Sequence, residues 1–230
     1  YSQAAALKHF GQQVDSVFAT DIEETFRLVE SRQAAHGVVP VENSTEGGIS
    51  STLDCLVATP LRICGEINLR VSHSLVGSSK HRDSAVTVLG HEQALAQCRQ
   101  WLDRHLPGLR KVAVSSNAEA VRQACEDPTV LAIAGGDTAK IYELEILEQG
   151  IEDQPGNTTR FFVIGNRTPS ASGQDKTSLA LSSRNRAGSL QRLLAPLAEN
   201  SISMTRIESR PSRTSLWEYV FFIDFEGHAT

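Results

Sequence analysis

Short runs of apolar residues alternate with amphipathic stretches from the start of the chain to about residue 165. The amphipathic stretches space their apolar residues near the 3.6-residue period of a helix, most clearly from His91 to His105. Alternation of this kind predicts an α/β fold, in which ligands meet the carboxyl ends of the strands. Six apolar runs are predicted as strands: residues 37–41, 61–64, 85–89, 111–114, 130–134 and 161–164.

The pattern changes at a polar stretch with Pro and Gly, which predicts a linker over residues 167–175 between domains at 1–166 and 176–230. The second domain reads as a strand (177–183), a helix (188–200) and two strands (202–208 and 216–226). Pro196 should bend or shorten the helix. This β-α-β-β order is most of a ferredoxin-like unit. In the last strand, period-two alternation places five large residues on one face: Trp217, Tyr219, Phe221, Ile223 and Phe225.

Composition narrows the class of protein. The 230 residues include 22 basic and 27 acidic side chains, and 40% are hydrophobic, which is enough for a buried core. A pI near 5.8 argues against a dedicated nucleic-acid binder. No apolar run approaches the ~18 residues of a membrane span and no signal peptide is seen, so we expect a cytoplasmic protein without membrane partners. The four cysteines form no CxxC pair and the seven histidines no HExxH pattern, so we expect no metal site.

Three loops are rich in groups that could carry chemistry. The first, residues 42–48, follows a predicted strand with Asn, Ser, Thr and two glycines. Such a loop either caps the next helix or holds an anion with its amides. The second, residues 134–138, lacks the spacing of a nucleotide-binding motif and reads first as a plain turn. The third, residues 155–161, places Asn, two Thr and Arg before an apolar strand, where a simple turn remains an equal alternative.

Taken together, these segments resemble the prephenate dehydratase family. Three ordered segments match family signatures: Gly37-Val-Val-Pro-Val-Glu-Asn-Ser-Thr-Glu-Gly47, Asn157-Thr-Thr-Arg-Phe161 and Ile207-Glu-Ser-Arg-Pro211. The opening Tyr1-Ser-Gln-Ala-Ala is similar to the end of the family's first motif, and Gly188-Ser-Leu190 to the GAL motif of its ACT regulatory domain. The layout is most similar to bacterial two-function members, in which a chorismate mutase domain precedes this region.

The resemblance implies an activity and a set of residues. Members convert prephenate to phenylpyruvate, which needs no cofactor but needs a proton donor at the departing hydroxyl and anchors for two carboxylates. Thr159 is implied as the donor, and Arg160 as a partner of a carboxylate or of the scaffold. The other residues implied around the substrate are Asn43, Ser44, Gln97, Thr158 and Phe161. Many members have Ser before the His at the start of the helix containing Gln97, and here Gly90 stands there.

The resemblance also implies a fold and a regulator. We expect a two-lobed catalytic domain like a type 2 periplasmic binding protein, lacking its first strand, and a ferredoxin-like ACT domain lacking its last helix and strand. Phenylalanine is the implied effector, bound where two ACT domains meet, so we expect a homodimer or larger homo-oligomer. The implied effector-site residues are Gly188, Leu190, Glu208, Ser209, Arg210 and Pro211.

Three other interpretations stay open at this point. The preferred substrate could be arogenate, the aminated relative of prephenate. A two-lobed fold also suits a sensor or solute-binding protein without catalysis. The βαββ order and its aromatic strand could belong to an RNA-binding module, although the aromatic pattern of such modules is missing and residues 175–230 carry seven basic against six acidic residues.

Overall fold

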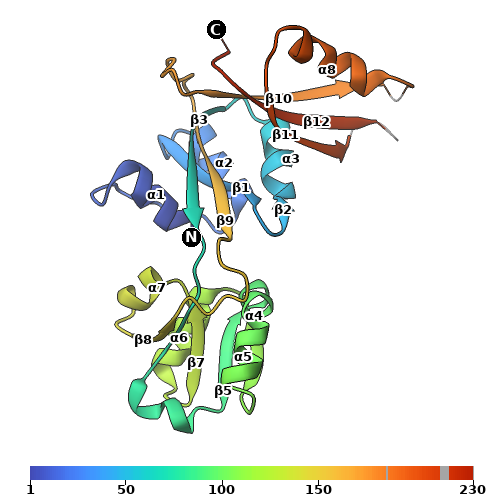
Figure 1. Cartoon of the computed structure of the whole chain (residues 1–230). Helices are drawn as coiled ribbons and strands as arrows, with labels where there is room; N and C mark the ends of the chain where they lie inside the picture. The colour runs from blue at the N-terminus through green and yellow to red at the C-terminus, as the bar shows by residue number, and fades with distance from the viewer. Residues whose placement is uncertain (185, 213–217, 230) are drawn as a thin grey trace. The chain divides into compact units, whose positions relative to one another are not determined.

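The structure, a computed structural model, describes residues 1–184, 186–212 and 218–229. The chain forms two compact units, each made of several chain segments. The first unit comprises Tyr1–Val14, Asn43–Thr45 and Asn68–Thr159. The second comprises Asp15–Glu42, Glu46–Ile67 and Arg160–Thr230. Both units combine helices with sheets (Figure 1), so the predicted α/β class is confirmed.

A five-stranded sheet forms the centre of the first unit, in the order β6-β5-β7-β4-β8. β5 runs parallel to β6 and β7, whereas β4 is antiparallel to β7 and β8. Two clusters of buried side chains form its core, one including Leu75, Leu102 and Ile133 and the other Val76, Val121 and Ala132. The elements are α1 (Ser2–Phe10), β4 (Ser74–Gly77), the 3-10 helix η1 (Ser79–Ser84), β5 (Thr87–His91), α4 (Glu92–Gln97), α5 (Arg99–His105), β6 (Arg110–Val114), α6 (Asn117–Glu126), β7 (Val130–Ala134), α7 (Gly136–Ile141) and β8 (Glu145–Gln149).

The prediction of one helix from His91 to His105 is wrong in one respect. The helix breaks at Cys98, which is fully buried and has φ −109° and ψ 10°, so that two short helices result. Asp153 caps the second helix, since its carboxylate accepts hydrogen bonds from the backbone N–H groups of Gln100 and Trp101, both at 2.8 Å. A carboxylate at a helix start satisfies amides that have no partner within the helix. Asp153 lies about 50 residues further along the chain, so helical periodicity could not reveal this break.

A four-stranded sheet in the order β2-β1-β9-β3 involves the second unit. Its core includes Phe26, Val39, Leu53 and Phe162. The strand predicted at residues 161–164 begins three residues earlier, at Thr158, because the two β-branched threonines continue the extended backbone. The elements are α2 (Ile22–Glu30), β1 (His36–Asn43), β2 (Gly47–Gly48), α3 (Ser50–Ala58), β3 (Arg62–Arg70) and β9 (Thr158–Gly165).

The C-terminal segment, Lys176–Glu226, has the predicted β-α-β-β order. Its strands form an antiparallel sheet in the order β10-β12-β11. Pro196 lies inside α8 without ending it, and the helix is one residue shorter than predicted at each end. Leu216 and Trp217 of the predicted last strand lie outside the described residues. The elements are β10 (Lys176–Ser183), α8 (Ser189–Glu199), β11 (Met204–Pro211) and β12 (Tyr219–Glu226).

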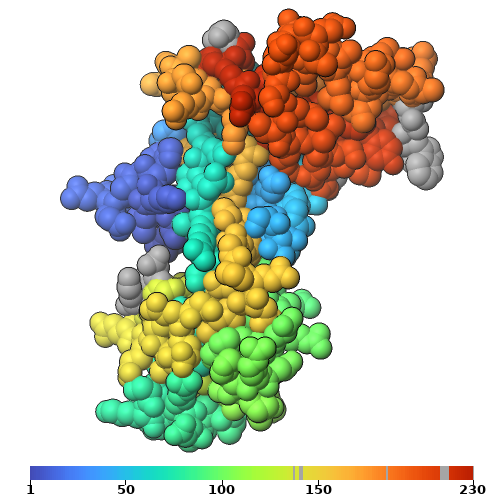
Figure 2. Space-filling model, in the orientation of Figure 1, coloured from blue at the N-terminus to red at the C-terminus, as the bar shows by residue number. Residues whose placement is uncertain are grey.

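Both faces of this small sheet are used, which the aromatic alternation did not predict. On β12, Phe222, Ile223 and Asp224 are all buried although they alternate between faces. Phe222 joins the cluster of Phe26, Leu53 and Phe162, so one face of the sheet packs against the α2–α3 part of the same unit. The space-filling view shows the C-terminal segment from one side (Figure 2).

Candidate functional site

A hydrogen bond joins two of the predicted site residues in the first unit. The Asn43 side-chain Nδ2 donates to Thr159 Oγ1 at 3.0 Å, and Thr159 is 8% exposed. The orientation of the Asn43 amide follows from the backbone, because the Thr45 N–H donates to Asn43 Oδ1 at 2.9 Å. The other end of the amide, a donor, must therefore face Thr159. Since the Thr159 oxygen accepts this hydrogen bond, its own hydrogen is directed elsewhere and can be donated.

The other predicted polar site residues of the unit form a second hydrogen-bonded group beside this pair. The backbone N–H of Thr158 donates to Ser44 Oγ at 2.9 Å, and Ser44 Oγ donates to Asn157 Oδ1 at 3.3 Å. Asn157 Nδ2 in turn donates to Gln97 Oε1 at 3.3 Å. Segments distant in the sequence thus bring Asn43, Ser44, Gln97, Thr158 and Thr159 together. Their chemistry is that of neutral donors and acceptors.

Arg160 has a different environment from Thr159, because successive side chains of a strand point to opposite faces. Within the second unit, its Nη1 lies 2.5 Å from Asp224 Oδ2, and its Nη2 lies 2.6 Å from Glu66 Oε2. Glu42 is 3.6 Å away, and the guanidinium stacks on the Phe162 ring at 4.9 Å from its centroid. Burial alone would lower the pKa of Arg160, but the hydrogen bond and charge of Asp224 and those of Glu66 outweigh it and raise the pKa. These contacts favour the scaffold role among the two expected for Arg160.

Phe161 is 1% exposed and points to the face opposite to Arg160. A fully buried phenyl ring contributes packing, and Phe161 is among the largest completely buried side chains of the described chain. Its predicted place beside the substrate stays a prediction.

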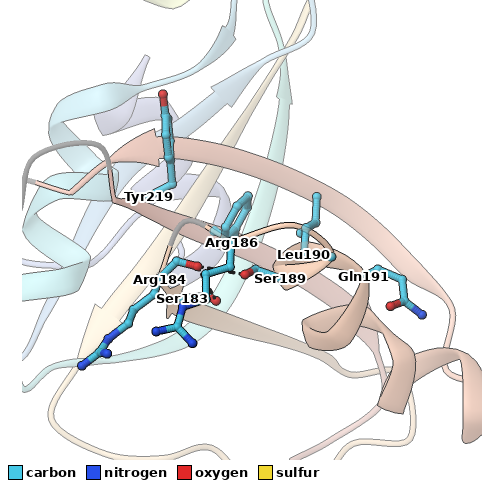
Figure 3. A pocket seen from close by; sticks show the side chains of 9 residues that line it. Ser183, Arg184, Arg186, Ser189, Leu190, Gln191 and Tyr219 are labelled. Carbon is cyan, nitrogen blue, oxygen red and sulfur yellow. Dashed lines mark hydrogen bonds between the residues drawn. The ribbon is translucent and has the colours of Figure 1, made fainter.

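The predicted effector residues divide between the two faces of the C-terminal sheet. A pocket of about 210 Å³ is lined by Gly188 and Leu190 at the start of α8, together with Tyr219 and Phe221 of β12 (Figure 3). Ser209 pairs with Phe221 and Pro211 with Tyr219 across the strands, on the face of this pocket. The pocket's other lining residues are Ser183, Arg184, Arg186, Ser189 and Gln191.

Glu208 and Arg210 occupy the opposite face of β11. Arg210 forms an ion pair with Asp54 of α3, at 3.3 Å, and Glu208 forms one with Arg206. Arg206 also lies 3.2 Å from Glu42. Ion pairs on this face therefore hold the C-terminal sheet against the α3 side of the unit. The segment 208–211 thus contributes side chains both to the face of the pocket and to the face packed against α3.

Three further residues of the first unit belong to the hydrogen-bonded group but were not predicted as site residues. Asn157 lies within the quoted motif, so the motif itself was the signal. His73 is one of the seven histidines, which show no metal-binding pattern, and Tyr1 is quoted only as part of a motif. Their long sequence separation from Gln97 left no local pattern to find them.

The described residues offer little support for a metal site, a reactive thiol or a membrane-spanning helix. In the portion that the structure describes, no group of three or more His, Cys, Asp or Glu side chains could hold a metal ion. Burial raises the pKa of the Cys98 thiol, which keeps it protonated and unreactive. No helix among the described residues is long and apolar enough to cross a membrane.

Comparison with known proteins agrees with this geometry. The family described as "Prephenate dehydratase" matches residues 1–169, and the family described as "ACT domain" matches residues 177–230. The chain belongs to the prephenate dehydratase family. A "Bifunctional chorismate mutase/prephenate dehydratase" of Neisseria gonorrhoeae is 52% identical over 99% of this chain. The chain spans 64% of the length of that curated relative.

Two solved structures have the same fold. Prephenate dehydratase from Arthrobacter aurescens, described as a complex with L-Phe, superposes with a TM-score of 0.91 at 32% identity, covering 100% of this chain and 78% of that one. A second structure, described as "GqqA- a novel type of quorum quenching acylases", gives a TM-score of 0.87 at 28% identity over 99% of this chain and 84% of its own. The predicted two-lobed catalytic fold with an ACT domain is thereby confirmed.

Proposed function

We propose that this chain catalyses the decarboxylating dehydration of prephenate to phenylpyruvate in phenylalanine biosynthesis. The observation that carries the proposal is the hydrogen bond from Asn43 to Thr159, within a chain that belongs to the prephenate dehydratase family. The relatives carry the name of this reaction. Our domain boundaries remain part of the proposal, with catalysis at residues 1–166, a linker at 167–175 and the ACT domain at 176–230.

The reaction requires one proton at the ring hydroxyl. The bond between the ring and its carboxylate breaks, and its electrons enter the ring as CO2 leaves. The bond to the hydroxyl breaks at the same time, and the hydroxyl leaves as water after taking the proton of Thr159. A threonine hydroxyl is a weak acid, so its oxygen needs stabilisation while the proton departs. The N–H of Asn43 supplies it, and Thr159 recovers its proton from solvent.

Replacing Thr159 tests this role. Thr159→Val keeps the shape of the side chain but removes the hydroxyl, and kcat should fall by roughly 10²–10⁴-fold, the usual contribution of a positioned proton donor. Thr159→Ser restores a hydroxyl and should recover much of the loss. Formation of phenylpyruvate from prephenate, followed by its absorbance in alkali, measures both. Retained turnover in Thr159→Val would remove Thr159 from the mechanism.

Phenylalanine is the proposed inhibitor. The pocket at the start of α8 offers the apolar side chains of Leu190 and Phe221 and two exposed arginines, Arg184 and Arg186, whose charge suits an amino-acid carboxylate. The relative from Arthrobacter aurescens is described in complex with L-Phe. Titration calorimetry with phenylalanine, with Leu190→Asp as the disrupted variant, tests the pocket. Binding undiminished by Leu190→Asp would place the effector elsewhere.

The same assays separate the alternatives. Faster turnover of arogenate than of prephenate would make the chain an arogenate dehydratase. Tight binding of prephenate by the wild-type protein without any product would favour a sensor. Hydrolysis of N-acyl amides, added because of the acylase relative, would indicate that other chemistry. We also propose that the chain is cytoplasmic and forms a homodimer or larger homo-oligomer through its ACT domain, which sedimentation with and without phenylalanine tests.

A further inference from the structure

A buried histidine lies at the end of the hydrogen-bonded group of the first unit. His73 is 3% exposed and directly precedes β4. Its Nε2 lies 2.8 Å from Gln97 Oε1, and its Nδ1 lies 3.2 Å from the hydroxyl of Tyr1. The mechanism above makes no use of it. A buried imidazole with a partner at each nitrogen is held in one position and one protonation pattern.

The hydrogen bonds of this group run in one consistent direction. The N–H of Thr158 donates to Ser44 Oγ, and Ser44 Oγ donates its own hydrogen to Asn157 Oδ1. The amide of Asn157 is thereby oriented with Nδ2 toward Gln97 Oε1. An amide oxygen can only accept, so it must also accept from His73, whose Nε2 therefore carries a hydrogen.

The other nitrogen of His73 is then an acceptor. The Tyr1 hydroxyl lies 3.2 Å from this Nδ1 and 3.3 Å from the backbone oxygen of Ser72, and we assign its single hydrogen to Nδ1. Burial raises the pKa of the Tyr1 phenol, which keeps its hydrogen in place. Gln97 Oε1 thus accepts two hydrogen bonds, from Asn157 and from His73. Two donors on one oxygen prevent the amide from exchanging its ends, because the exchange would bring N–H groups against N–H groups. The backbone of Gln97 is held as well, since the N–H of Asp153 donates to its carbonyl at 2.7 Å.

We propose that His73, in its Nε2–H form, is a positioning residue that holds the Gln97 amide with its NH2 group as a donor to a substrate carboxylate. The inference rests on the proposed function and deepens it. A dianionic substrate gains from donors of fixed direction, because no reorganisation is needed when it binds. His73 itself does not touch the substrate, and acts through Gln97.

Three variants test the role through kinetics. His73→Leu removes the Nε2–H donor to Gln97. It should lower kcat/KM about 10–100-fold, which corresponds to the loss of one hydrogen bond to a charged group, and the change should appear mainly as a higher KM. His73→Gln places an amide N–H near the position of Nε2 and should recover most of the loss. His105→Leu, the same change at an exposed histidine of the same unit, should leave KM unchanged. Urea unfolding of each variant shows whether a kinetic loss comes from a misplaced Gln97 amide or from a less stable fold.

A double-variant cycle identifies Gln97 as the residue through which His73 acts. In a Gln97→Ala background, His73→Leu should raise KM no further, because the amide it positions is gone. Fully additive effects of the two changes, or a His73→Gln variant as impaired as His73→Leu, would overturn the proposal. If the wild-type protein turns over prephenate normally in the same assay, such a result refutes the role of His73 alone.

The tautomer can be measured without any activity. In ¹⁵N-labelled protein, the ring of His73 should show a protonated Nε2 and an unprotonated Nδ1 at neutral pH. Tyr1→Phe should disturb this pattern, since it removes the donor to Nδ1. A ring protonated at Nδ1 in the wild-type protein would overturn the proposal whatever the substrate proves to be. A wild-type protein without turnover, in contrast, would refute the proposed function and leave this test intact.

Discussion

Replacing Arg160 by Met should destabilise the second unit more than any loss of a surface ion pair. The Arg160 side chain is 12% exposed, and the side chain of its partner Asp224 is only 3% exposed. Met fills much of the same volume but removes the charge, so that Asp224 keeps a buried charge without a cation. The charge of Glu66 stays compensated, because the Lys176 ammonium remains 3.0 Å from the Glu66 carboxylate. The loss therefore arises mainly at Asp224.

Breaking a buried pair by removal of one partner typically costs about 3–5 kcal/mol. For a chain of this size, that corresponds to a fall of roughly 6–20 °C in the unfolding temperature. Urea unfolding at pH 7.5, followed by tryptophan fluorescence and circular dichroism, measures it. Arg122→Met is the matched control: its ion pairs with Glu119 and Glu126 on α6 are solvent-exposed, so the midpoint should hardly move.

The loss of stability in Arg160→Met should depend on pH in a defined direction. Burial alone would raise the pKa of Glu66, but hydrogen bonds from Lys176 and the charge of Arg160 outweigh it and lower the pKa below the usual 4.5. A carboxyl with a lowered pKa in the folded state stabilises the protein above 4.5, and this contribution disappears as the pH falls through the folded-state value. The part of the difference between wild type and Arg160→Met that arises at Glu66 should therefore shrink as the pH is lowered below about 4.5.

A double variant decides whether the buried charge is the cause. Arg160→Met combined with Asp224→Leu removes both charges and should be more stable than Arg160→Met alone, since no isolated ion remains. The reasoning is refuted if Arg160→Met lowers the stability by less than about 1 kcal/mol, the range of exposed pairs. A double variant less stable than the single one would equally refute it.

Two glycines give further predictions. In Gly77→Ala, the new Cβ would lie 2.6 Å from Leu131 Cδ2 inside the first unit, and overpacking should lower the stability by about 1–3 kcal/mol in urea unfolding. In Gly48→Ala, the new Cβ would overlap the carboxylate of Glu208 and displace it from Arg206, so the unfolding midpoint should fall and inhibition by phenylalanine should weaken in the phenylpyruvate assay. Gly108→Ala, with no atom within 4 Å, is the control for both, and equal midpoints for all three variants would contradict the packing argument.

Local patterns in the sequence predicted most strands, because a buried strand is a compact apolar run. They missed β4 and β8 of the first unit. β4 has only four residues, and β8 carries three charged or amide side chains among its five, so neither stands out from its flanks. The break of the helix at Cys98 depends on Asp153, which only the folded chain brings near. Short strands and distant caps are decided by tertiary structure, beyond the reach of periodicity.

The site shows the same division between local and distant information. The motifs predicted which residues carry the chemistry, and the structure joins Asn43 to Thr159 in one hydrogen-bonded pair and Gln97 to Asn157 and Ser44 in another group. The motifs did not indicate to which face of a strand each side chain points. The sequence placed Thr159 and Arg160 before the strand, whereas the structure includes both in β9, where neighbouring side chains point to opposite faces. His73 was missed because a single histidine has no pattern.

The opposite directions of Thr159 and Arg160 bear on how an anionic substrate can be held. Arg160 contacts three carboxylates, Glu42, Glu66 and Asp224, so its charge is already compensated within the protein. A substrate carboxylate would have to compete with ion pairs that are largely buried, at a considerable loss of stability. Neutral donors of fixed direction avoid that competition, and the group around Gln97 consists of such donors. The more Arg160 is committed to the scaffold, the more the affinity for a dianion depends on how firmly the amide of Gln97 is oriented, which is the task that the structure gives to His73.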